Sequence, residues 1–320
     1  MNKVLITARV FYKLPELIKK IKEQGAEIVT NPYQGHTLSE ENLLEIIGGV
    51  DAVICGDDYF TAKVMKKANR LKVISKFGVG VDRIDIQAAN DKGITVTNCP
   101  GSNKHAVADM TIGLMLSVMR HIPKTHNEVV YEGRWRVVTG TEAYGKTLGI
   151  IGLGAIGREV AKRAKGFDMK ILAYDPYPDM AFVEKLDVAL VSMEDIFRRS
   201  NIVSVHLPSI PGTKGIINKD LFNIVKDGIF FINTARGDVI NDRDLYDALQ
   251  SGQVLGAGLD VMSSEPPERD HFLFGLDNVI VTSHIGAHTI EAQRRAGNMA
   301  IENAFLVLNG QEPLFRVKGK

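Results

Sequence analysis

Short apolar runs alternate with segments of helical hydrophobic spacing along the first hundred residues. The apolar runs predict strands at residues 4–7, 27–30, 51–55 and 73–76. The helical spacing predicts helices at residues 14–23 and 61–68, and another helix that opens after Ser39, whose hydroxyl suits an N-cap. Strands that alternate with helices indicate a parallel sheet, so this part is predicted to be a doubly wound α/β unit.

The same alternation resumes after residue 147. Residues 158–165 have helical spacing, and apolar runs predict strands at residues 148–151, 169–174, 202–206, 230–233, 256–261 and 279–282. Each of the last four strands leads into polar residues. Because the carboxyl ends of parallel strands meet at one edge of a sheet, these polar residues could line one crevice.

The connecting segments indicate two domains, as a chain of 320 residues suits. Residues 99–103 break the alternation and resemble an interdomain crossing. Residues 106–119 form an apolar helix that we expect to cross between the domains, and the helix predicted at 289–309 could return to the first domain. Residues 121–146 are polar, are expected to be irregular, and hold the single tryptophan, Trp135. This arm could form a dimer contact or a covering loop.

Composition narrows the class of protein. A formal net charge of +1 provides no electrostatic reason to expect nucleic acid or an anionic membrane as a partner. Two cysteines, Cys55 and Cys99, are too few for a disulfide framework, which favours the reducing cytoplasm. No apolar run reaches the roughly 18 residues of a membrane span. The chain opens directly on a predicted strand, so no signal peptide is expected, and no metal site is predicted.

Residues 148–157 carry a dinucleotide-binding pattern. An apolar strand enters a G-x-G-x-x-G turn made by Gly152, Gly154 and Gly157, and a helix follows. Such a turn aims backbone N–H groups and the positive end of the helix dipole at a pyrophosphate. Asp175 ends the next strand, 18 residues after Gly157, where an acid binds the ribose hydroxyls. This acid favours NAD, because it would repel the additional phosphate of NADP.

A second glycine turn follows the strand at residues 73–76. Gly78 and Gly80 lie where open α/β sheets bind ligands, but no third glycine follows at nucleotide spacing. Exposed N–H groups at this turn would suit a smaller anion such as a carboxylate. A simple glycine-rich connector is the alternative.

Three later strand ends carry residues suited to catalysis. Arg236 can bind a carboxylate bidentately and polarise a neighbouring carbonyl. Glu265 precedes two prolines that stiffen its backbone, and His284 follows the last strand. A histidine near a glutamate can act as a general acid and base, because the carboxylate raises the pKa of the histidine and sets its tautomer. Taken singly, each could instead form a surface ion pair or hydrogen bond.

Five motifs in register resemble those of the D-isomer-specific 2-hydroxyacid dehydrogenases, a family that includes phosphoglycerate dehydrogenase and glyoxylate/hydroxypyruvate reductase. The similarity covers nearly the whole chain, and its motifs lie at residues 77–82, 152–157, 233–237, 258–266 and 283–286. It implies a flavodoxin-like substrate domain at residues 1–103 plus 289–320. It also implies a Rossmann NAD-binding domain at residues 104–288 and a homodimer.

The resemblance also implies roles for individual residues. Arg236, Glu265 and His284 would be the catalytic residues of an NAD-dependent oxidoreductase. Val79, Gly80 and Arg236 would bind the substrate carboxylate, while His284 donates a proton to the keto oxygen as hydride reaches the carbonyl carbon. The implied contacts with NAD are Thr111, Gly152, Gly154, Ala155, Ile156, Gly157, Asp175, His206, Pro208, Thr234, Ala235, Asp260, His284 and Gly286.

The substrate is less sharply defined by the motifs. Phosphoglycerate-specific members carry an Arg-Ser-x-Thr stretch that binds phosphate, whereas residues 55–61 hold no arginine and two acids, Asp57 and Asp58. Acids near a phosphate would raise its binding cost, although many short members lack this arginine. The chain ends soon after its last predicted helix, so a C-terminal regulatory domain and serine feedback through it are not expected.

Two other functions fit the motifs in part. A phosphite dehydrogenase would keep the Arg-Glu-His residues, whereas formate dehydrogenases carry glutamine where this chain has Glu265. An NADH-sensing corepressor of the C-terminal-binding type would share the fold and these residues, but it would carry additional tails. The steady-state rate of NADH oxidation distinguishes an enzyme from a sensor.

Overall fold

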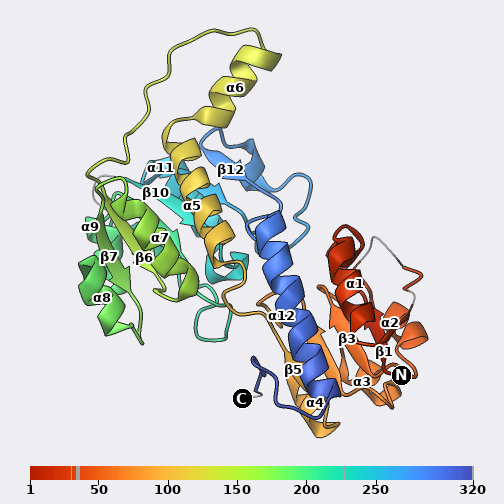
Figure 1. Cartoon of the computed structure of the whole chain (residues 1–320). Coiled ribbons are helices and arrows are strands. Elements are labelled where there is room, and N and C mark those ends of the chain that lie inside the picture. The colour runs from red at the N-terminus through yellow and green to blue at the C-terminus, as the bar shows by residue number, and fades with distance from the viewer. Residues whose placement is uncertain (30, 34–36, 226–227, 319–320) are drawn as a thin grey trace. The chain divides into compact units, whose positions relative to one another are not determined.

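The computed structural model describes residues 1–29, 31–33, 37–225 and 228–318, which form two compact units (Figure 1). The first unit consists of Met1–Asn103 and His288–Lys320, and the second of Lys104–Ala287. Each unit is built around its own parallel sheet, as the alternating pattern predicts. The predicted fold class, two doubly wound parallel-sheet units, is confirmed.

The first unit contains a five-stranded sheet in the flavodoxin-like order β2-β1-β3-β4-β5. Helices cover both faces, so β3 and β4 are buried along their full length. The strands are β1 (Lys3–Ile6), β2 (Glu27–Val29), β3 (Ala52–Cys55), β4 (Val73–Lys76) and β5 (Thr95–Thr97). Thr30, predicted to end the second strand, lies outside the described residues.

Alternate residues of these strands enter two separate apolar cores. Val4 and Ile6 face one core, while Leu5 between them faces the other. The helices of this unit are η1 (Arg9–Tyr12), α1 (Pro15–Glu23), α2 (Glu40–Ile46), α3 (Ala62–Lys67), α4 (Ile86–Asp91) and α12 (Ile290–Leu308). Ser39 caps α2 as predicted, since its hydroxyl accepts a hydrogen bond from the Asn42 amide at 3.3 Å.

Helix α12 returns the end of the chain to the first unit, as predicted. It packs against β3, β4, β5 and α1, and Figure 1 shows this blue helix beside the orange strands. The Ser75 hydroxyl on β4 donates to the Ala300 carbonyl at 2.8 Å. A Cβ at Gly297 would lie 2.4 Å from a Leu17 methyl carbon, so a glycine is needed where α12 meets α1.

The second unit contains a seven-stranded sheet in the order β12-β11-β10-β9-β6-β7-β8. Counted from β6, this is the Rossmann order extended by one strand. Its strands are β6 (Thr147–Ile151), β7 (Lys170–Tyr174), β8 (Val188–Leu190), β9 (Ile202–Val205), β10 (Ile229–Asn233), β11 (Val254–Leu259) and β12 (Val279–Val281). Its helices are α5 (Lys104–Met119), α6 (Ile122–Tyr131), α7 (Ala155–Lys165), α8 (Met180–Leu186), α9 (Met193–Arg199), α10 (Lys219–Phe222), α11 (Asp242–Ser251), η2 (Gly237–Val239) and η3 (Phe272–Gly275).

Two expectations for this unit are wrong. Helix α5 does not cross between the units: it lies wholly within the second unit, where it packs against α7, β10 and β11. The segment 121–146 is not irregular throughout, because it contains helix α6. Several apolar side chains of α6 are exposed, including Ile122 and Val130, so α6 lacks the buried apolar stripe that reveals a helix in sequence.

No helix in the described parts of the chain has the length and apolar character needed to cross a membrane.

Candidate active site

Arg236, Glu265 and His284 follow three neighbouring strands of the second unit. Arg236 comes just after β10, Glu265 lies in the loop between β11 and β12, and His284 comes just after β12. The three strands are adjacent and parallel, so their carboxyl ends meet at one edge of the sheet. The Glu265 carboxylate contacts the His284 ring, and the charge of Arg236 acts on both residues. The predicted residues are therefore brought together.

The contact between His284 and Glu265 sets the protonation pattern of the imidazole. His284 Nδ1 lies 2.7 Å from Glu265 Oε2, while the Met262 amide donates to Glu265 Oε1 at 3.2 Å. An ionised carboxylate only accepts hydrogen bonds, so Nδ1 carries a proton. Nε2 is then the ring nitrogen that can exchange a proton with a substrate.

The pKa values of the two partners move in opposite directions. The hydrogen bond that His284 donates to Glu265 raises the pKa of His284 above its ordinary value, and the charges of Glu265 and Asp260 add to the rise. Burial and the charge of Arg236 oppose it. Burial alone would raise the pKa of Glu265, but the His284 contact, the Met262 amide and Arg236 bring this pKa below its ordinary value. The directions of both shifts agree with the prediction that Glu265 favours protonated His284.

Asp260 holds the turn that carries His284. Its carboxylate accepts hydrogen bonds from the Thr282 hydroxyl at 2.6 Å and from the amides of Ile285 and Gly286 at 2.9 and 2.7 Å. Its carbonyl accepts from the His284 amide at 2.8 Å. His284 has a φ of 55°, a left-handed conformation that a bulky side chain adopts only when its surroundings impose it. Asp260 is predicted to contact NAD, and its anchoring of this turn is a role that the sequence pattern does not indicate.

The turn that carries Arg236 is held by Asn233 and pressed against the Glu265 loop. The Asn233 side chain donates to the Arg236 carbonyl at 2.8 Å and accepts from the Ala235 amide at 3.0 Å. A Cβ at Gly237 would lie 2.0 Å from the Met262 carbonyl carbon. Only glycine allows this approach, so the two loops are in direct backbone contact.

The glycine turn after β6 fits a dinucleotide. A Cβ at Gly157 would lie 2.1 Å from the Gly152 carbonyl oxygen, and a Cβ at Gly152 would lie 2.7 Å from the His206 carbonyl oxygen. Gly154, the N-cap residue of α7, has open space where its Cβ would be. Gly152 and Gly157 thus allow close backbone packing, and Gly154 leaves a pyrophosphate room to approach the helix N-terminus.

Asp175 lies beside this turn, as the fingerprint requires. Its Oδ2 accepts from the Leu153 amide at 2.7 Å and its Oδ1 from the Tyr177 amide at 2.8 Å. These bonds orient the carboxylate at the end of β7 and join it to the turn. Its position fits the ribose-binding acid of an NAD site.

Other predicted NAD contacts lie at the neighbouring strand ends. The hydroxyls of Thr111 and Thr234 are 2.8 Å apart, which joins α5 to the end of β10. His206 follows β9, and its Nε2 lies 2.9 Å from the Ser204 hydroxyl. Its Nδ1 is buried with no hydrogen-bond partner in the described part of the chain, and burial lowers the pKa of His206 to about 3. The exposed Pro208 follows, and its carbonyl accepts from the Thr213 hydroxyl at 2.6 Å.

Val79 and Gly80 belong to the first unit, in the turn after β4. Gly78 has a φ of 128°, which glycine adopts readily, and the Asn98 side chain donates to the Val79 carbonyl at 2.7 Å. Neither the Val79 nor the Gly80 amide donates a hydrogen bond to another of the residues that the structure describes. The turn therefore has the donors that an anion would need.

Lys76, at the end of β4, is a buried cation that no motif in the sequence indicates. Its side chain is 8% exposed, and its ammonium donates to Asp57 at 2.9 Å and to the Phe77 carbonyl at 3.1 Å. Asp58 is buried, and it accepts from the Thr7 hydroxyl and the Leu38 and Gly56 amides. One acid is therefore paired with a cation and the other holds the backbone, and the expectation that two acids raise the binding cost of a phosphate here stays a prediction.

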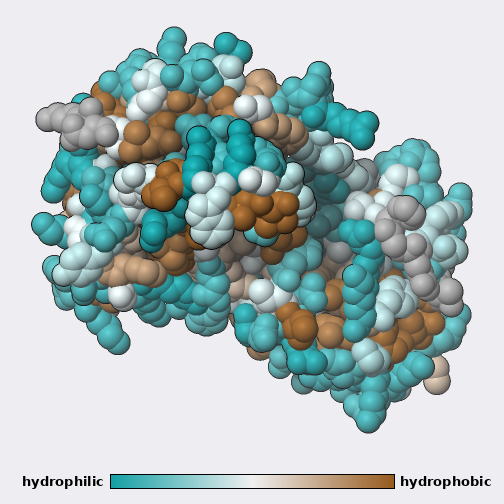
Figure 2. All heavy atoms as spheres, turned by 90° about the horizontal axis from the view of Figure 1, so that it is seen from above, coloured by the Kyte–Doolittle hydropathy of each residue, from teal (hydrophilic) through white to brown (hydrophobic). Residues whose placement is uncertain are grey.

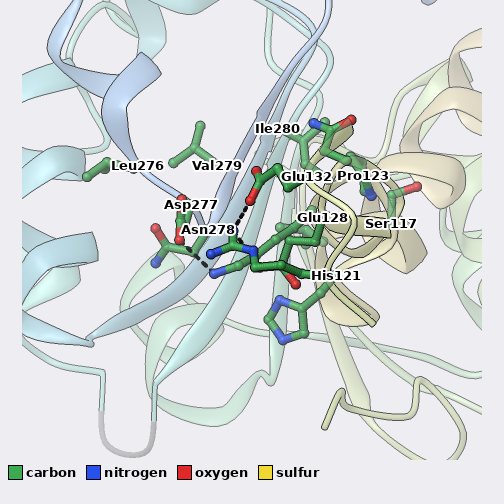
Figure 3. Close-up of a pocket in the computed structure, with 14 residues that line it drawn as sticks. Ser117, His121, Pro123, Glu128, Glu132, Leu276, Asp277, Asn278, Val279 and Ile280 are labelled. Atoms are coloured by element: carbon green, nitrogen blue, oxygen red, sulfur yellow. Dashed lines mark hydrogen bonds and ion pairs between the residues drawn. The ribbon is translucent and has the colours of Figure 1, made fainter. Parts of the chain in front are cut away.

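A cavity of about 260 Å³ lies elsewhere in the second unit, between the end of α5, α6 and the start of β12. Figure 3 shows Glu128 and Glu132 from the α6 region near Asp277 and Asn278, which precede β12. None of the predicted site residues lines this cavity. Within the described residues, no group of histidine, cysteine, aspartate and glutamate side chains could hold a metal ion.

The fold and the glycine turn define a dinucleotide-binding α/β protein. The family model of the D-isomer specific 2-hydroxyacid dehydrogenase NAD binding domain matches residues 112–286. The chain belongs to this family, and its second unit contains the NAD-binding domain.

Three relatives illustrate the similarity. The hydroxypyruvate reductase of Thermotoga maritima is 43% identical, over 84% of this chain and 88% of that protein. The D-3-phosphoglycerate dehydrogenase of Methanocaldococcus jannaschii is 40% identical over 97% of this chain, which spans only 58% of that protein. The apo structure of D-lactate dehydrogenase from Escherichia coli has a TM-score of 0.86 at 27% identity, covering 99% of this chain and all of the other.

The pKa of His284 can be tested directly by NMR titration of its ring. We expect a pKa above the ordinary value of about 6.5 in the wild type, and a lower pKa in Glu265→Gln, which lacks the carboxylate charge. Exposed Glu268 in the same loop provides the matched control, and Glu268→Gln should leave the titration unchanged. Equal pKa values in the wild type and Glu265→Gln would contradict this account of the pair.

Proposed function

We propose that this protein is an NAD-dependent oxidoreductase that interconverts D-2-hydroxy acids and 2-oxo acids. The observation that carries the proposal is the hydrogen-bonded Glu265–His284 pair, placed with Arg236 at the strand ends of an NAD-binding domain. Relatives named phosphoglycerate dehydrogenase, hydroxypyruvate reductase and glyoxylate reductase support the same class of reaction.

In the proposed mechanism, protonated His284 donates the Nε2 proton to the oxygen of the 2-oxo acid as it becomes an alkoxide. Glu265 keeps the ring charged and oriented, because an adjacent anion favours imidazolium. Arg236 binds the substrate carboxylate and polarises the keto oxygen, and the Val79 and Gly80 amides also bind the carboxylate. The bound nicotinamide supplies the hydride, and oxidation of the hydroxy acid is the reverse.

The cofactor would be held by the residues that the fingerprint and the family pattern predict. We assign the pyrophosphate to the turn at residues 152–157 and the adenosine ribose to Asp175. The remaining proposed contacts come from Thr111, His206, Pro208, Thr234, Ala235, Asp260, His284 and Gly286. Thr111, His206 and Thr234 lie at or beside strand ends of one sheet, which supports this assignment.

Replacement of His284 tests the proposed chemistry. We expect His284→Ala to lose about 10²–10⁴-fold in kcat for NADH-dependent reduction of hydroxypyruvate, because the general acid is lost. Binding of NADH, measured by fluorescence titration, should remain. The control is His288→Ala, which removes a histidine four residues away. Full turnover in His284→Ala would refute the assignment, whereas no turnover in the wild type with tight NADH binding would favour the corepressor-like function.

Lys76 bears on the choice of substrate. We propose that its ammonium binds an anionic substituent on the third carbon of the substrate, as in 3-phosphohydroxypyruvate. The Lys76 side chain is only 8% exposed, whereas that of its partner Asp57 is 73% exposed. The counter-ion can therefore give way to a phosphate. Hydroxypyruvate and glyoxylate lack this anion. Phosphite would be the substrate if the protein were instead a phosphite dehydrogenase.

A substrate panel in the Lys76→Met variant tests this proposal. We expect kcat/KM for 3-phosphohydroxypyruvate to fall about 10- to 100-fold, the cost of losing a charged hydrogen bond, with little change for glyoxylate. The exposed Lys72→Met is the matched control. Equal losses of kcat/KM for both substrates would show that Lys76 does not bind the phosphate. Phosphite oxidation that exceeds all the 2-oxo acids in the wild type would favour the alternative function.

We also propose that the protein is a homodimer in which the arm at residues 121–146 contacts a second copy. The arm exposes large apolar side chains, including Tyr131, Trp135 and Val137, of which the last two are 87% and 94% exposed. Figure 2 looks onto this end of the second unit and shows apolar side chains among polar ones. Exposed apolar groups gathered on one segment mark an interaction surface.

Sedimentation velocity tests the dimer. We expect a mass about twice the 35.2 kDa of one chain, and dissociation to monomers in Trp135→Asp, because a buried unpaired charge is costly. Tyr177→Asp introduces the same charge at a 92% exposed site outside the arm and should remain dimeric. A monomeric wild type, or equal dissociation of both variants, would contradict the proposal.

A cytoplasmic location is the remaining proposal. It is supported by two buried free cysteines, which suit a reducing compartment. Burial raises the pKa of Cys99 to about 11 and raises that of Cys55 further, so both stay as unreactive thiols.

A further inference from the structure

The loop between β11 and β12 is held at two points by one carboxylate. Asp242 is the first residue of α11, and its side chain is 15% exposed. Its Oδ2 accepts a hydrogen bond from the Ser263 hydroxyl at 2.5 Å and lies 3.6 Å from His271 Nε2. Ser263 and His271 stand on opposite sides of Glu265 in the sequence. Asp242 therefore closes the segment 263–271, which contains Glu265, into a clasped loop.

The position of His271 supports its pairing with Asp242. The Leu273 amide donates to His271 Nδ1 at 3.4 Å, so this nitrogen is an acceptor and the proton lies on Nε2, which faces Asp242. The His271 ring stacks on Phe272 at 4.3 Å, and Phe272 makes an edge contact with Tyr246 of α11 at 5.4 Å. The far end of the loop is thus packed against the helix that carries Asp242.

The near end of the loop leads directly to the candidate active site. Ser263 follows Met262, whose amide donates to the Glu265 carboxylate. Glu265 in turn contacts His284. A continuous chain of contacts therefore runs from Asp242 through Ser263 and Met262 to Glu265 and the imidazole.

We propose that Asp242 is a positioning residue for Glu265, and through Glu265 for the proton on His284. The catalytic consequence rests on the proposed function, whereas the effect on Glu265 geometry does not. A carboxylate suits this place because one oxygen can face two donors, and because an anion is favoured in the first turn of a helix. Without it, the hydroxyl of Ser263 and the ring of His271 lose their common partner and the loop loses its closure.

The first test is the titration of His284, which needs no turnover. Glu265, Asp260 and Arg236 are the charged groups with the largest effects on the pKa of this ring. Ser263→Ala breaks the same contact without removing a charge, so a changed pKa in both Asp242→Ala and Ser263→Ala would report a displaced Glu265. We expect at least half of the decrease seen in Glu265→Gln. We also expect no further decrease in the double variant, because both changes act through one contact.

The matched control is Asp244→Ala, which removes another aspartate from the first turn of α11. Asp244 accepts from the Lys219 amide and has no hydrogen bond to the Glu265 loop among the residues described. Asp244→Ala should leave the titration of His284 unchanged. If Asp242→Ala does not fold, Ser263→Ala removes one hydroxyl and decides the question, and Ser263→Thr should restore the wild-type titration. An unchanged pKa in the folded Asp242 or Ser263 variant, or an equal change in Asp244→Ala, would overturn the proposal.

The second test is the pH profile of kcat for 2-oxo acid reduction. We expect the alkaline limb of Asp242→Ala to move to lower pH and kcat to fall roughly 10- to 100-fold, the effect of a small misplacement of a catalytic group. NADH binding should be unchanged. If Glu265→Gln leaves this profile unchanged, the proposed function fails. If Glu265→Gln moves the profile and Asp242→Ala does not, only the positioning role fails.

Discussion

The candidate site depends on the parallel alignment of β10, β11 and β12. Because these strands are neighbours and run in one direction, the residues that follow them emerge at one edge of the sheet. Three residues that are distant in sequence are therefore brought together: Glu265 pairs with His284, and the charge of Arg236 acts on His284. The backbone ladder sets the approximate position of each loop, and polar anchors such as Asn233 and Asp260 set the final orientation.

The charged groups of the site differ in how directly they act on the His284 ring. Asp260 is 1% exposed, and its carboxylate is hydrogen-bonded to the turn. Its charge therefore acts on the ring of His284 without contacting it. Glu265 contacts the ring directly, and Arg236 opposes both acids. The raised pKa of His284 favours folding at pH values below the ordinary pKa of histidine, and this contribution is lost as the pH rises through the folded-state pKa. The Glu265–His284 contact therefore favours the protonated ring and also stabilises the loop that carries Glu265.

The features that could be predicted from the sequence are those encoded by neighbouring residues. Apolar runs identified the strands, the spacing of Gly152, Gly154 and Gly157 identified the dinucleotide turn, and the motifs identified the family. Helix α6 was missed because its apolar side chains face solvent. Lys76, Asp242 and the anchoring role of Asp260 were missed for a different reason: their partners lie elsewhere in the chain, and side-chain hydrogen bonds leave no periodic trace in the sequence. The catalytic and cofactor roles stay predictions.

Gly237 has a consequence for engineering. Since the backbone of the Arg236 turn touches the backbone at Met262, the loops after β10 and β11 form one interlocking part. A loop transplanted from another enzyme after β11 would have to reproduce the course of the chain at residues 262–263, or it would displace the arginine as well as the glutamate. Replacement of the loop after β11 therefore requires a matching replacement of the loop after β10.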